Sequence, residues 1–269
     1  LPMLVVLHGC LMSANQMAKL TRYNELADRE HFLVAYPAEK FHLCWDAWSP
    51  KSQARGAGEP AILAGMVAKF EADYQVDPHR VYIAGASSGG GMAAIMLACY
   101  SDLFAAGAIY SGAMYKAAVD SASTRDAMKN GSVFSPDQRG EEAWRCAGSP
   151  SPRLVPVLVF HGSADPIASP VNGEQIVRQF LRTNDLGDDR QANGSIGARP
   201  SSVEQAQVPG GRAYTVSTYK YDGKPLIQYY LIDGMGHAYS GGNPAAPLSD
   251  PKGPDASRIS WSFFQRWRR

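Results

Sequence analysis

The sequence lacks an excess of charge of either sign, and it lacks a long apolar run. Its 26 Lys and Arg residues nearly balance its 25 Asp and Glu residues, which gives a formal net charge of +1. Proteins that bind nucleic acid or an anionic membrane surface usually carry a large basic field, so we expect neither partner. The longest apolar run, 92–100, has about half of the ~20 residues that span a bilayer. We therefore expect a soluble protein.

Signatures of nucleotide and metal sites are also missing. The glycine-rich stretch 85–91 has no Lys-Ser or Lys-Thr after its glycines, as a P-loop would, and no strand leads into G-x-G-x-x-G with a ribose-binding acid. The four cysteines lie far apart, so they form no C-x-x-C pair for zinc, and no H-E-x-x-H motif occurs. We expect no cofactor and no metal.

Short apolar runs alternate with helical patterns along the chain. Ser13 and Gln16 fit a capping box at the start of the first helix. The predicted strands are 4–7, 32–36, 81–84, 105–110, 154–160 and 226–232, and the predicted helices are 13–27, 62–74, 93–100, 171–181 and 259–267. Strands that alternate with helices indicate the α/β class, with a mostly parallel central sheet flanked by helices on both faces.

The length of 269 residues favours one domain, 1–269, since α/β folds often exceed the ~100–200 residues of a typical domain. Two stretches interrupt the alternation. Residues 113–152 contain no clear strand and suggest a small inserted cap-like segment. Residues 184–212 are rich in Gly, Asn, Asp, Ser and Pro and predict a long surface loop.

A candidate nucleophile follows the strand 81–84. Residues 85–89 have the sequence Gly-Ala-Ser-Ser-Gly and lead into a helix, which is the strand–turn–helix context of the nucleophile elbow in α/β-hydrolases. Ser87 would then stand at a helix N-terminus, where free N–H groups favour developing negative charge. Ser88 is the competing serine, but only Ser87 has a glycine two positions away on each side.

A serine nucleophile needs a general base and a carboxylate that orients the base. His237 comes shortly after the strand 226–232, and Asp165 comes shortly after the strand 154–160. Both residues are therefore expected at the carboxyl edge of the sheet, which is where α/β folds place their sites. The chain order Ser87, Asp165, His237 is also the α/β-hydrolase order.

Other residues compete for these roles. Asp233 is the rival acid, but it lies four residues before His237 and is expected to shape a turn. His8 and His161 stand at strand ends before glycine, where an imidazole more often braces a loop by hydrogen bonding. Solvated or structural positions are expected for the remaining histidines, which are His31, His42 and His79.

The oxyanion hole requires two N–H groups. One belongs to the residue after the nucleophile and the other to a loop near the first strand. The first is Ser88. Cys10 follows the strand 4–7 at the same edge and is the expected second donor, through its backbone only.

These motifs together resemble the polyhydroxybutyrate (PHB) depolymerase family of esterases, in register over residues 2–243. The resemblance rests on His8-Gly9-Cys10, Cys44-Trp45, Asp77-Pro78-His79-Arg80-Val81-Tyr82, residues 85–92, residues 161–165, Pro209-Gly210-Gly211-Arg212 and residues 234–242. It implies the same triad, Ser87, Asp165 and His237. Ser88 stands where family members commonly have Ala, and Tyr239 where they commonly have Trp.

We expect a serine esterase that cleaves carboxylic esters, most readily PHB-type polyester or its oligomers. Feruloyl and acetylxylan esterases share the scaffold and are the alternative, as are an acyltransferase with the same residues and a polymer-binding module without catalysis. Trp45, Trp48 and Tyr239 are expected in loops at the active edge, where they could line a mostly apolar cleft or merely pack the loops. We expect a monomer.

The cysteines suggest two disulfides. Cys10 and Cys44 each follow a predicted strand at the active edge, so neighbouring loops could bring them within disulfide distance. By elimination Cys99 would pair with Cys146 and attach the 113–152 segment to the helix after the nucleophile. Two bridges favour a secreted protein, whereas four reduced thiols in a cytosolic enzyme are the alternative.

Overall fold

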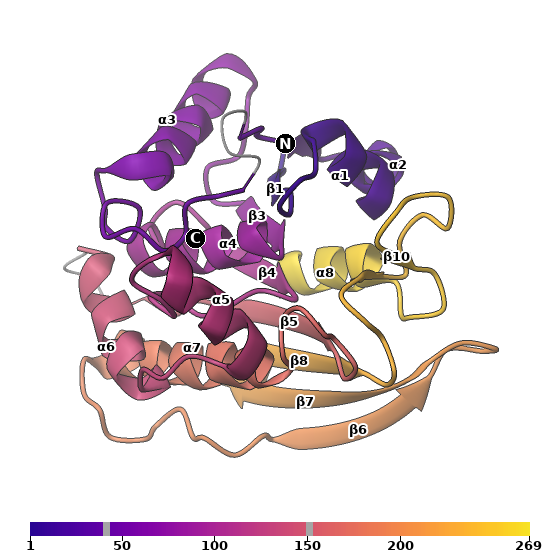
Figure 1. Cartoon of the computed structure of the whole chain (residues 1–269). Coiled ribbons are helices and arrows are strands. Elements are labelled where there is room, and N and C mark those ends of the chain that lie inside the picture. The colour runs from indigo at the N-terminus through magenta and orange to yellow at the C-terminus, as the bar shows by residue number, and fades with distance from the viewer. Residues whose placement is uncertain (40–43, 149–152) are drawn as a thin grey trace.

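A computed structural model describes residues 1–39, 44–148 and 153–269 (Figure 1). His42 and the last residues of the 113–152 segment, 149–152, lie outside these ranges. No helix of the described residues is long and apolar enough to cross a membrane.

The centre of the fold is a twisted sheet, in which the described residues form eight strands in the order β2-β1-β3-β4-β5-β8-β7-β6. Strands β2, β1, β3, β4, β5 and β8 pair in parallel with their neighbours in that order. Strands β7 and β6 are antiparallel additions at the β8 edge. The strands are β1 (Met3–Leu7), β2 (Leu33–Ala35), β3 (Val81–Ala86), β4 (Ala106–Tyr110), β5 (Val157–Gly162), β6 (Ser202–Gln207), β7 (Ala213–Tyr221) and β8 (Lys224–Ile232). The mostly parallel sheet predicted from the sequence is confirmed.

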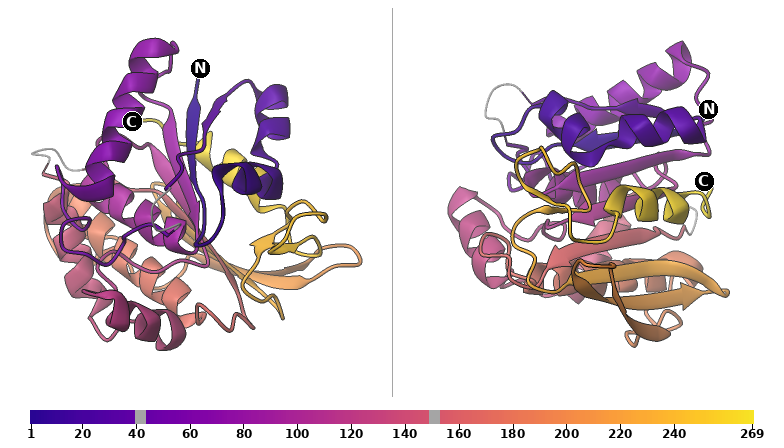
Figure 2. Two further views of the ribbon diagram at one scale, coloured as in Figure 1. Left: turned by 45° about the horizontal axis from the view of Figure 1, so that its top comes forward. Right: turned by 90° about the vertical axis from the view of Figure 1, so that its right-hand side faces the viewer.

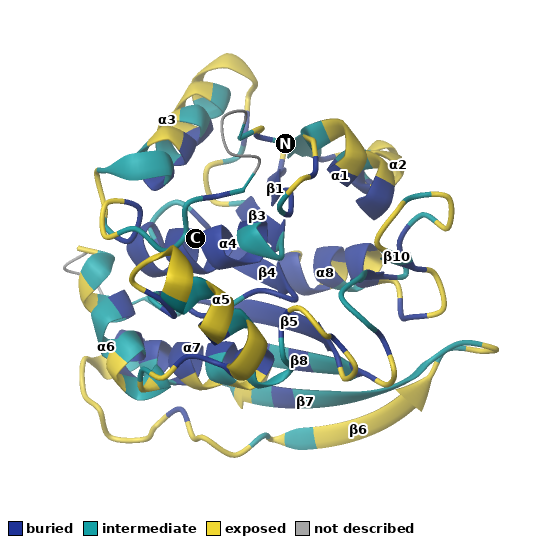
Figure 3. Cartoon of the chain, viewed as in Figure 1, coloured by how far each residue is buried: buried dark blue, intermediate teal, exposed yellow. Residues whose placement is uncertain are grey.

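Helices cover both faces of the sheet (Figure 2). One face carries α3 (Gly58–Asp73), α4 (Ser88–Cys99) and α7 (Val171–Asp189), and the other carries α1 (Ala14–Thr21), α2 (Tyr23–Glu30) and α8 (Ala256–Phe264). The inner strands β1, β3, β4 and β5 are therefore buried on both sides (Figure 3), which explains their continuous apolar sequences. The predicted α/β class is confirmed.

The first predicted helix is divided in two. Ser13 and Gln16 form the predicted capping box. The helix nevertheless ends at Thr21, because Arg22 adopts a left-handed conformation with φ 57° and turns the chain into α2. Periodicity over 13–27 could not show this, since the apolar spacing continues across the turn.

The prediction of a long surface loop over 184–212 is wrong at both ends. Helix α7 continues to Asp189, and Asn184 is fully buried, where its side chain hydrogen-bonds the backbone N–H and carbonyl of Val155. At the other end, Ser202–Gln207 forms β6 and pairs with β7. A polar composition therefore concealed a buried helix end and an edge strand.

The described part of the 113–152 segment contains α5 (Ser121–Asn130) and α6 (Pro136–Cys146). Helix α6 packs along α7 and ends at Cys146, which is bonded to Cys99 at the end of α4. A second disulfide joins Cys10 to Cys44. Both predicted pairings are thus present in the structure.

A final two-stranded sheet pairs β9 (Tyr239–Ser240) with β10 (Ser249–Asp250). It follows the loop that carries His237 and holds this part of the chain beside α8 (Figure 1).

Candidate active site

Ser87 occupies a sharp turn between β3 and α4. Its backbone has φ 55° and ψ −118°, a conformation that non-glycine residues rarely adopt and that tends to occur at functional sites. A side chain at Gly85 would collide with the carbonyl of Gly89, and a Cβ at Gly89 would lie 2.5 Å from the carbonyl oxygens of Leu7 and His8. The two glycines predicted to form the elbow are therefore required by close backbone packing.

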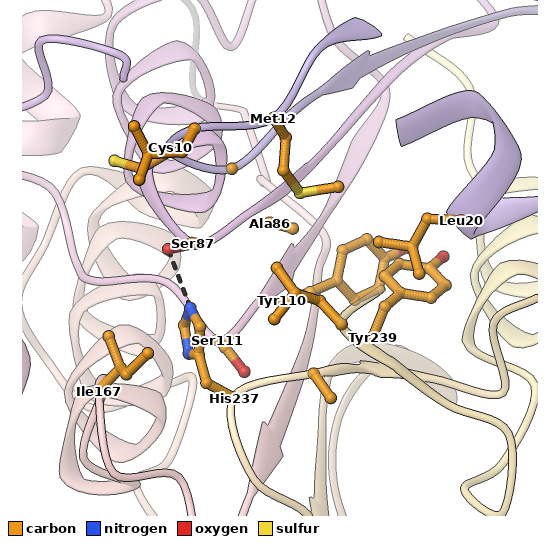
Figure 4. Close-up of a pocket in the computed structure, with 14 residues that line it drawn as sticks. Cys10, Met12, Leu20, Ala86, Ser87, Tyr110, Ser111, Ile167, His237 and Tyr239 are labelled. Atoms are coloured by element: carbon orange, nitrogen blue, oxygen red, sulfur yellow. Dashed lines mark hydrogen bonds between the residues drawn. The ribbon is translucent and has the colours of Figure 1, made fainter. Parts of the chain in front are cut away.

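The structure brings Ser87, His237 and Asp165 into one hydrogen-bonded chain. His237 Nε2 lies 3.0 Å from Ser87 Oγ (Figure 4), and His237 Nδ1 lies 2.8 Å from Asp165 Oδ2. A carboxylate only accepts hydrogen bonds, so Nδ1 carries the proton and Nε2 accepts from the serine hydroxyl. This is the arrangement in which an imidazole can act as a general base toward serine.

Asp165 is fixed and kept ionised by its surroundings. Its second oxygen, Oδ1, accepts hydrogen bonds from the N–H groups of Ile167 and Ala168 at 2.9 and 2.8 Å. Burial raises the pKa of this carboxyl, but the hydrogen bond and charge of His237 and the two N–H donors outweigh burial, and the net pKa lies below its ordinary value. The carboxylate is therefore available to stabilise a protonated imidazole.

The rival residues have other contacts. His161 is fully buried, donates from Nε2 to the carbonyl of Ala168 at 2.8 Å and braces the turn that carries Asp165. Desolvation lowers its pKa, which favours the neutral ring. His8 Nε2 accepts from the N–H of Glu39, which also braces a loop. Asp233 is exposed, and its carbonyl accepts from the Arg212 side chain.

The two residues predicted to supply the oxyanion N–H groups, Ser88 and Cys10, line the same cavity as Ser87. Ser88 is the first residue of α4, so its N–H has no acceptor within the helix. Cys10 follows β1 and, like Ser88, lines a cavity that contains Ser87. Its disulfide with Cys44 ties down the loop that carries its N–H.

Two cavities meet at Ser87, Cys10 and Ile167, which line both of them. The first, the His237 cavity, has a volume of about 230 Å³. Figure 4 shows its Ser87 and His237 beside a wall of Met12, Leu20, Tyr110 and Tyr239. The second, the Trp45 cavity, has a volume of about 280 Å³ and is lined by Trp45, Trp48, Ala113, Met114, Ala117, Ala118, Thr124, Arg125, Ala127 and Met128, among others.

The three aromatic residues predicted for the cleft line these cavities, but two of them are buried. Trp45 and Trp48 belong to the Trp45 cavity, where Trp45 Nε1 donates to the carbonyl of His8 at 3.0 Å. Tyr239 belongs to the His237 cavity and is in β9 rather than in a loop, with its hydroxyl 2.7 Å from Ser257 Oγ. Trp45 and Tyr239 therefore also pack the fold.

Sequence reasoning missed Ile167 and the α5 residues of the Trp45 cavity. Ile167 is 54% exposed in the structure, and the signal available in the sequence was an apolar residue only two positions after the catalytic candidate Asp165. Helix α5 offered none, because its sequence is polar and its cavity-lining residues, Thr124, Arg125, Ala127 and Met128, are of mixed character.

A mostly parallel sheet with a serine at the turn from β3 into α4 is the architecture of the α/β-hydrolase esterases, and the chain is of this class. The solved structure of acetyl xylan esterase from Aspergillus awamori has a TM-score of 0.78 and 22% identity, with 98% of this chain and 88% of that chain covered. The structure of esterase PE8 has a TM-score of 0.54 and 14% identity, covering 98% and 92%. Both show the fold.

Within that class, the chain belongs to the family described as Esterase PHB depolymerase, whose model matches residues 1–204. The resemblance stated from the motifs is thereby confirmed, and the chain is classed among carboxylic ester hydrolases.

Proteins similar to this chain carry several names. Poly(3-hydroxyalkanoate) depolymerase C of Paucimonas lemoignei is 29% identical over 91% of this chain, which spans only 56% of that relative. Feruloyl esterase B of Neurospora crassa is 31% identical over 87% of this chain and 77% of its own length. Probable acetylxylan esterase A of Aspergillus clavatus is 28% identical over 87% and 73%.

Proposed function

We propose that the chain hydrolyses carboxylic esters through an acyl-enzyme on Ser87. The observation that carries this proposal is the hydrogen-bonded chain from Ser87 through His237 to Asp165, which opens onto two largely apolar cavities. Such a constellation supports acyl transfer without a metal or an organic cofactor.

The proposed mechanism assigns a role to each of these residues. Ser87 Oγ attacks the ester carbonyl carbon while its proton moves to His237 Nε2, and the N–H groups of Cys10 and Ser88 hold the resulting oxyanion. The carbon–oxygen bond to the alcohol then breaks, and His237 returns the proton to that alcohol. Water, activated by His237, cleaves the acyl-enzyme in the same way. Asp165 maintains the imidazole tautomer throughout.

We further propose a polyester of short hydroxyacyl units, or its oligomers, as the substrate. Two cavities that meet at Ser87 support a chain substrate that continues past the scissile ester in both directions, and their apolar walls suit uncharged units. One water molecule takes up about 30 Å³ in the liquid, and an acetyl group consists of only a few atoms of about that size. It would therefore leave most of either cavity, of about 230 and 280 Å³, unfilled. Feruloyl esters remain the second candidate, because a larger acyl group could enter the Trp45 cavity.

The test compares purified wild type with Ser87→Ala on hydroxybutyrate oligomers, methyl ferulate and acetylated xylan. Ser87→Ala is expected to lose essentially all ester turnover while its circular dichroism spectrum and melting temperature stay near wild type. Retained turnover would contradict the acyl-enzyme. A clear wild-type preference for ferulate or acetylated xylan would replace the polyester proposal and leave the triad unaffected. Product analysis with an added acceptor alcohol distinguishes hydrolysis from acyl transfer to alcohols.

We also propose that the protein acts outside the cytoplasm, as a monomer. Two disulfides in a chain of this size support an oxidising compartment, since cytosolic thiols are generally kept reduced. Alkylation mapping without reductant would contradict this location if it found all four cysteines reactive in protein isolated from its native source.

A further inference from the structure

The two cavities differ in which part of the catalytic machinery they contain. The His237 cavity includes the imidazole, whereas the Trp45 cavity includes Ser88, whose N–H faces the developing oxyanion in the proposed mechanism. The imidazole must reach both Ser87 Oγ and the leaving oxygen, so the alcohol part of the ester belongs on the His237 side. The acyl part then extends into the Trp45 cavity. This assignment rests on the proposed function.

The acyl side has one charged residue in an otherwise uncharged lining. Arg125 lines the Trp45 cavity together with small apolar residues, two tryptophans and two methionines. It is exposed, so it stands on the solvent side of the cavity, whereas Trp45 and Ala118 are buried. Among the described residues, Arg125 is thus the one charged side chain that an acyl chain attached to Ser87 would meet in this cavity.

Helix α5 holds Arg125 over the cavity. The helix begins with a capping box formed by Asp120 and Ser123. Met128 lies three positions after Arg125 and four after Thr124, so the side chains of these residues share the face of the helix that lines the cavity. Lys129 lies on the same helix, is exposed and is not among the lining residues.

The guanidinium of Arg125 has unused hydrogen-bonding capacity. Arg125 makes no hydrogen bond or ion pair with any residue that the structure describes, and because the residue is exposed its five donors are open to water. An apolar acyl chain that fills the cavity would displace some of this water without replacing its hydrogen bonds, which is unfavourable for a charged donor. An acyl group with an oxygen at its far end would replace them.

We propose that Arg125 is a specificity-determining residue that binds an oxygen acceptor at the distal end of the acyl group. The acceptor can be the carbonyl of the next ester in a polyester or the carboxylate of a dicarboxylic half-ester, because both offer lone pairs to a guanidinium. Arg125 thereby favours oxygenated acyl chains over plain alkanoyl chains of the same length.

The test measures kcat/KM for three ethyl esters by acid release at constant pH. Ethyl butyrate has a plain acyl chain, diethyl succinate carries a distal ester carbonyl, and monoethyl succinate carries a distal carboxylate. Wild type, Arg125→Gln and the matched surface control Lys129→Gln are compared. Arg125→Gln is expected to lower kcat/KM about tenfold or more for at least one succinate ester, mainly through KM, with ethyl butyrate changed less than twofold. Lys129→Gln is expected to match wild type on all three.

The outcomes separate the two levels of the proposal. A selective loss on both succinates supports recognition of any distal oxygen, and a loss on monoethyl succinate alone supports recognition of the carboxylate. An equal effect of Arg125→Gln on all three esters, no effect at all, or the same losses in Lys129→Gln would overturn the role of Arg125. Absence of turnover on every ester by folded wild type would instead overturn the proposed ester hydrolysis.

Discussion

Ser87 has a backbone conformation that is unfavourable for a serine by itself. A non-glycine residue at positive φ costs on the order of 1–3 kcal/mol, and it persists only where the surroundings enforce it. Here Gly85 and Gly89 permit the close approach of β3, α4 and the end of β1 that enforces the turn. The same turn places the serine hydroxyl above the sheet, where His237 can reach it.

At the residue scale, Asp165→Asn tests the role of the carboxylate. Asparagine retains an oxygen that accepts from the N–H groups of Ile167 and Ala168, so the fold should persist. It cannot keep the Nδ1–H tautomer of His237 or stabilise an imidazolium, and kcat should fall by on the order of 10³–10⁴. Ester turnover and melting temperature are measured together. A variant that keeps more than a tenth of wild-type kcat would show that Asp165 is not the orienting acid.

The candidate triad could be predicted from the sequence because each member comes within a few residues of the end of an apolar strand. Ser87, Asp165 and His237 come after β3, β5 and β8, which are parallel neighbours or near neighbours, so their carboxyl ends meet at one edge. The distances could not be predicted, because they depend on loop conformations such as the turn braced by His161.

At the element scale, the antiparallel edge was overlooked although it left a signal. Strand β7 alternates in character, and the turn to β8 contains Asp222-Gly223, with φ 49° and 73°. This dipeptide between two strand-like runs is a strong indication of a hairpin. Strand β6 was not predictable in the same way, since five of its six residues, 203–207, are exposed and its identity comes from pairing with β7.

The two disulfides act on different elements, and their removal should have different effects. Cys99→Ala with Cys146→Ala releases α6 from the end of α4 and opens a loop with a sequence separation of 47. Unfolding free energy should fall by about 2–4 kcal/mol, measured by urea denaturation, with kcat near that of wild type at low temperature.

Cys10→Ala with Cys44→Ala supplies the contrast. It frees the loop that carries the proposed oxyanion donor, so kcat should fall by tenfold or more at a temperature where the variant is still folded. If the Cys99–Cys146 variant lost activity as strongly as the Cys10–Cys44 variant, the Cys99–Cys146 bridge could not be assigned a purely structural role.

At the scale of the whole molecule, the candidate active site lies where segments distant in sequence converge. The loop after β1, the elbow after β3, the turn after β5 and the loop after β8 all contribute residues to the His237 cavity or its catalytic chain. The Trp45 cavity additionally needs α5, which the sequence could not place because nothing in its polar pattern specifies the partner face. In the proposed function, the residues at the sheet edge thus carry out the reaction, and the segments over that edge, which are harder to predict from the sequence, select the substrate.

The last prediction concerns acid stability, for which Asp102 is well placed. Its two oxygens accept from the Arg55 guanidinium at 2.6 Å each, and Arg55 also donates to the carbonyl of Cys99. Burial raises the pKa of Asp102, but the hydrogen bonds and charge of Arg55 lower it by more than burial raises it. The net pKa in the folded protein is therefore below its ordinary value. The pair links the loop around Arg55 to the end of α4.

A depressed folded-state pKa means that the unfolded chain binds the proton more tightly. The stabilisation from ionised Asp102 is therefore fully present above the unfolded pKa of ~3.9 and is lost as pH falls through the lower folded value. Asp102→Asn should be less stable than wild type at pH ~6, and the difference should shrink as pH falls below ~4. Urea unfolding across this range measures it. Asp28→Asn, at an exposed carboxylate with no ion pair among the described residues, is the control and should give a nearly constant offset. A difference for Asp102→Asn that stays constant with pH would show that the ion pair does not stabilise the folded protein.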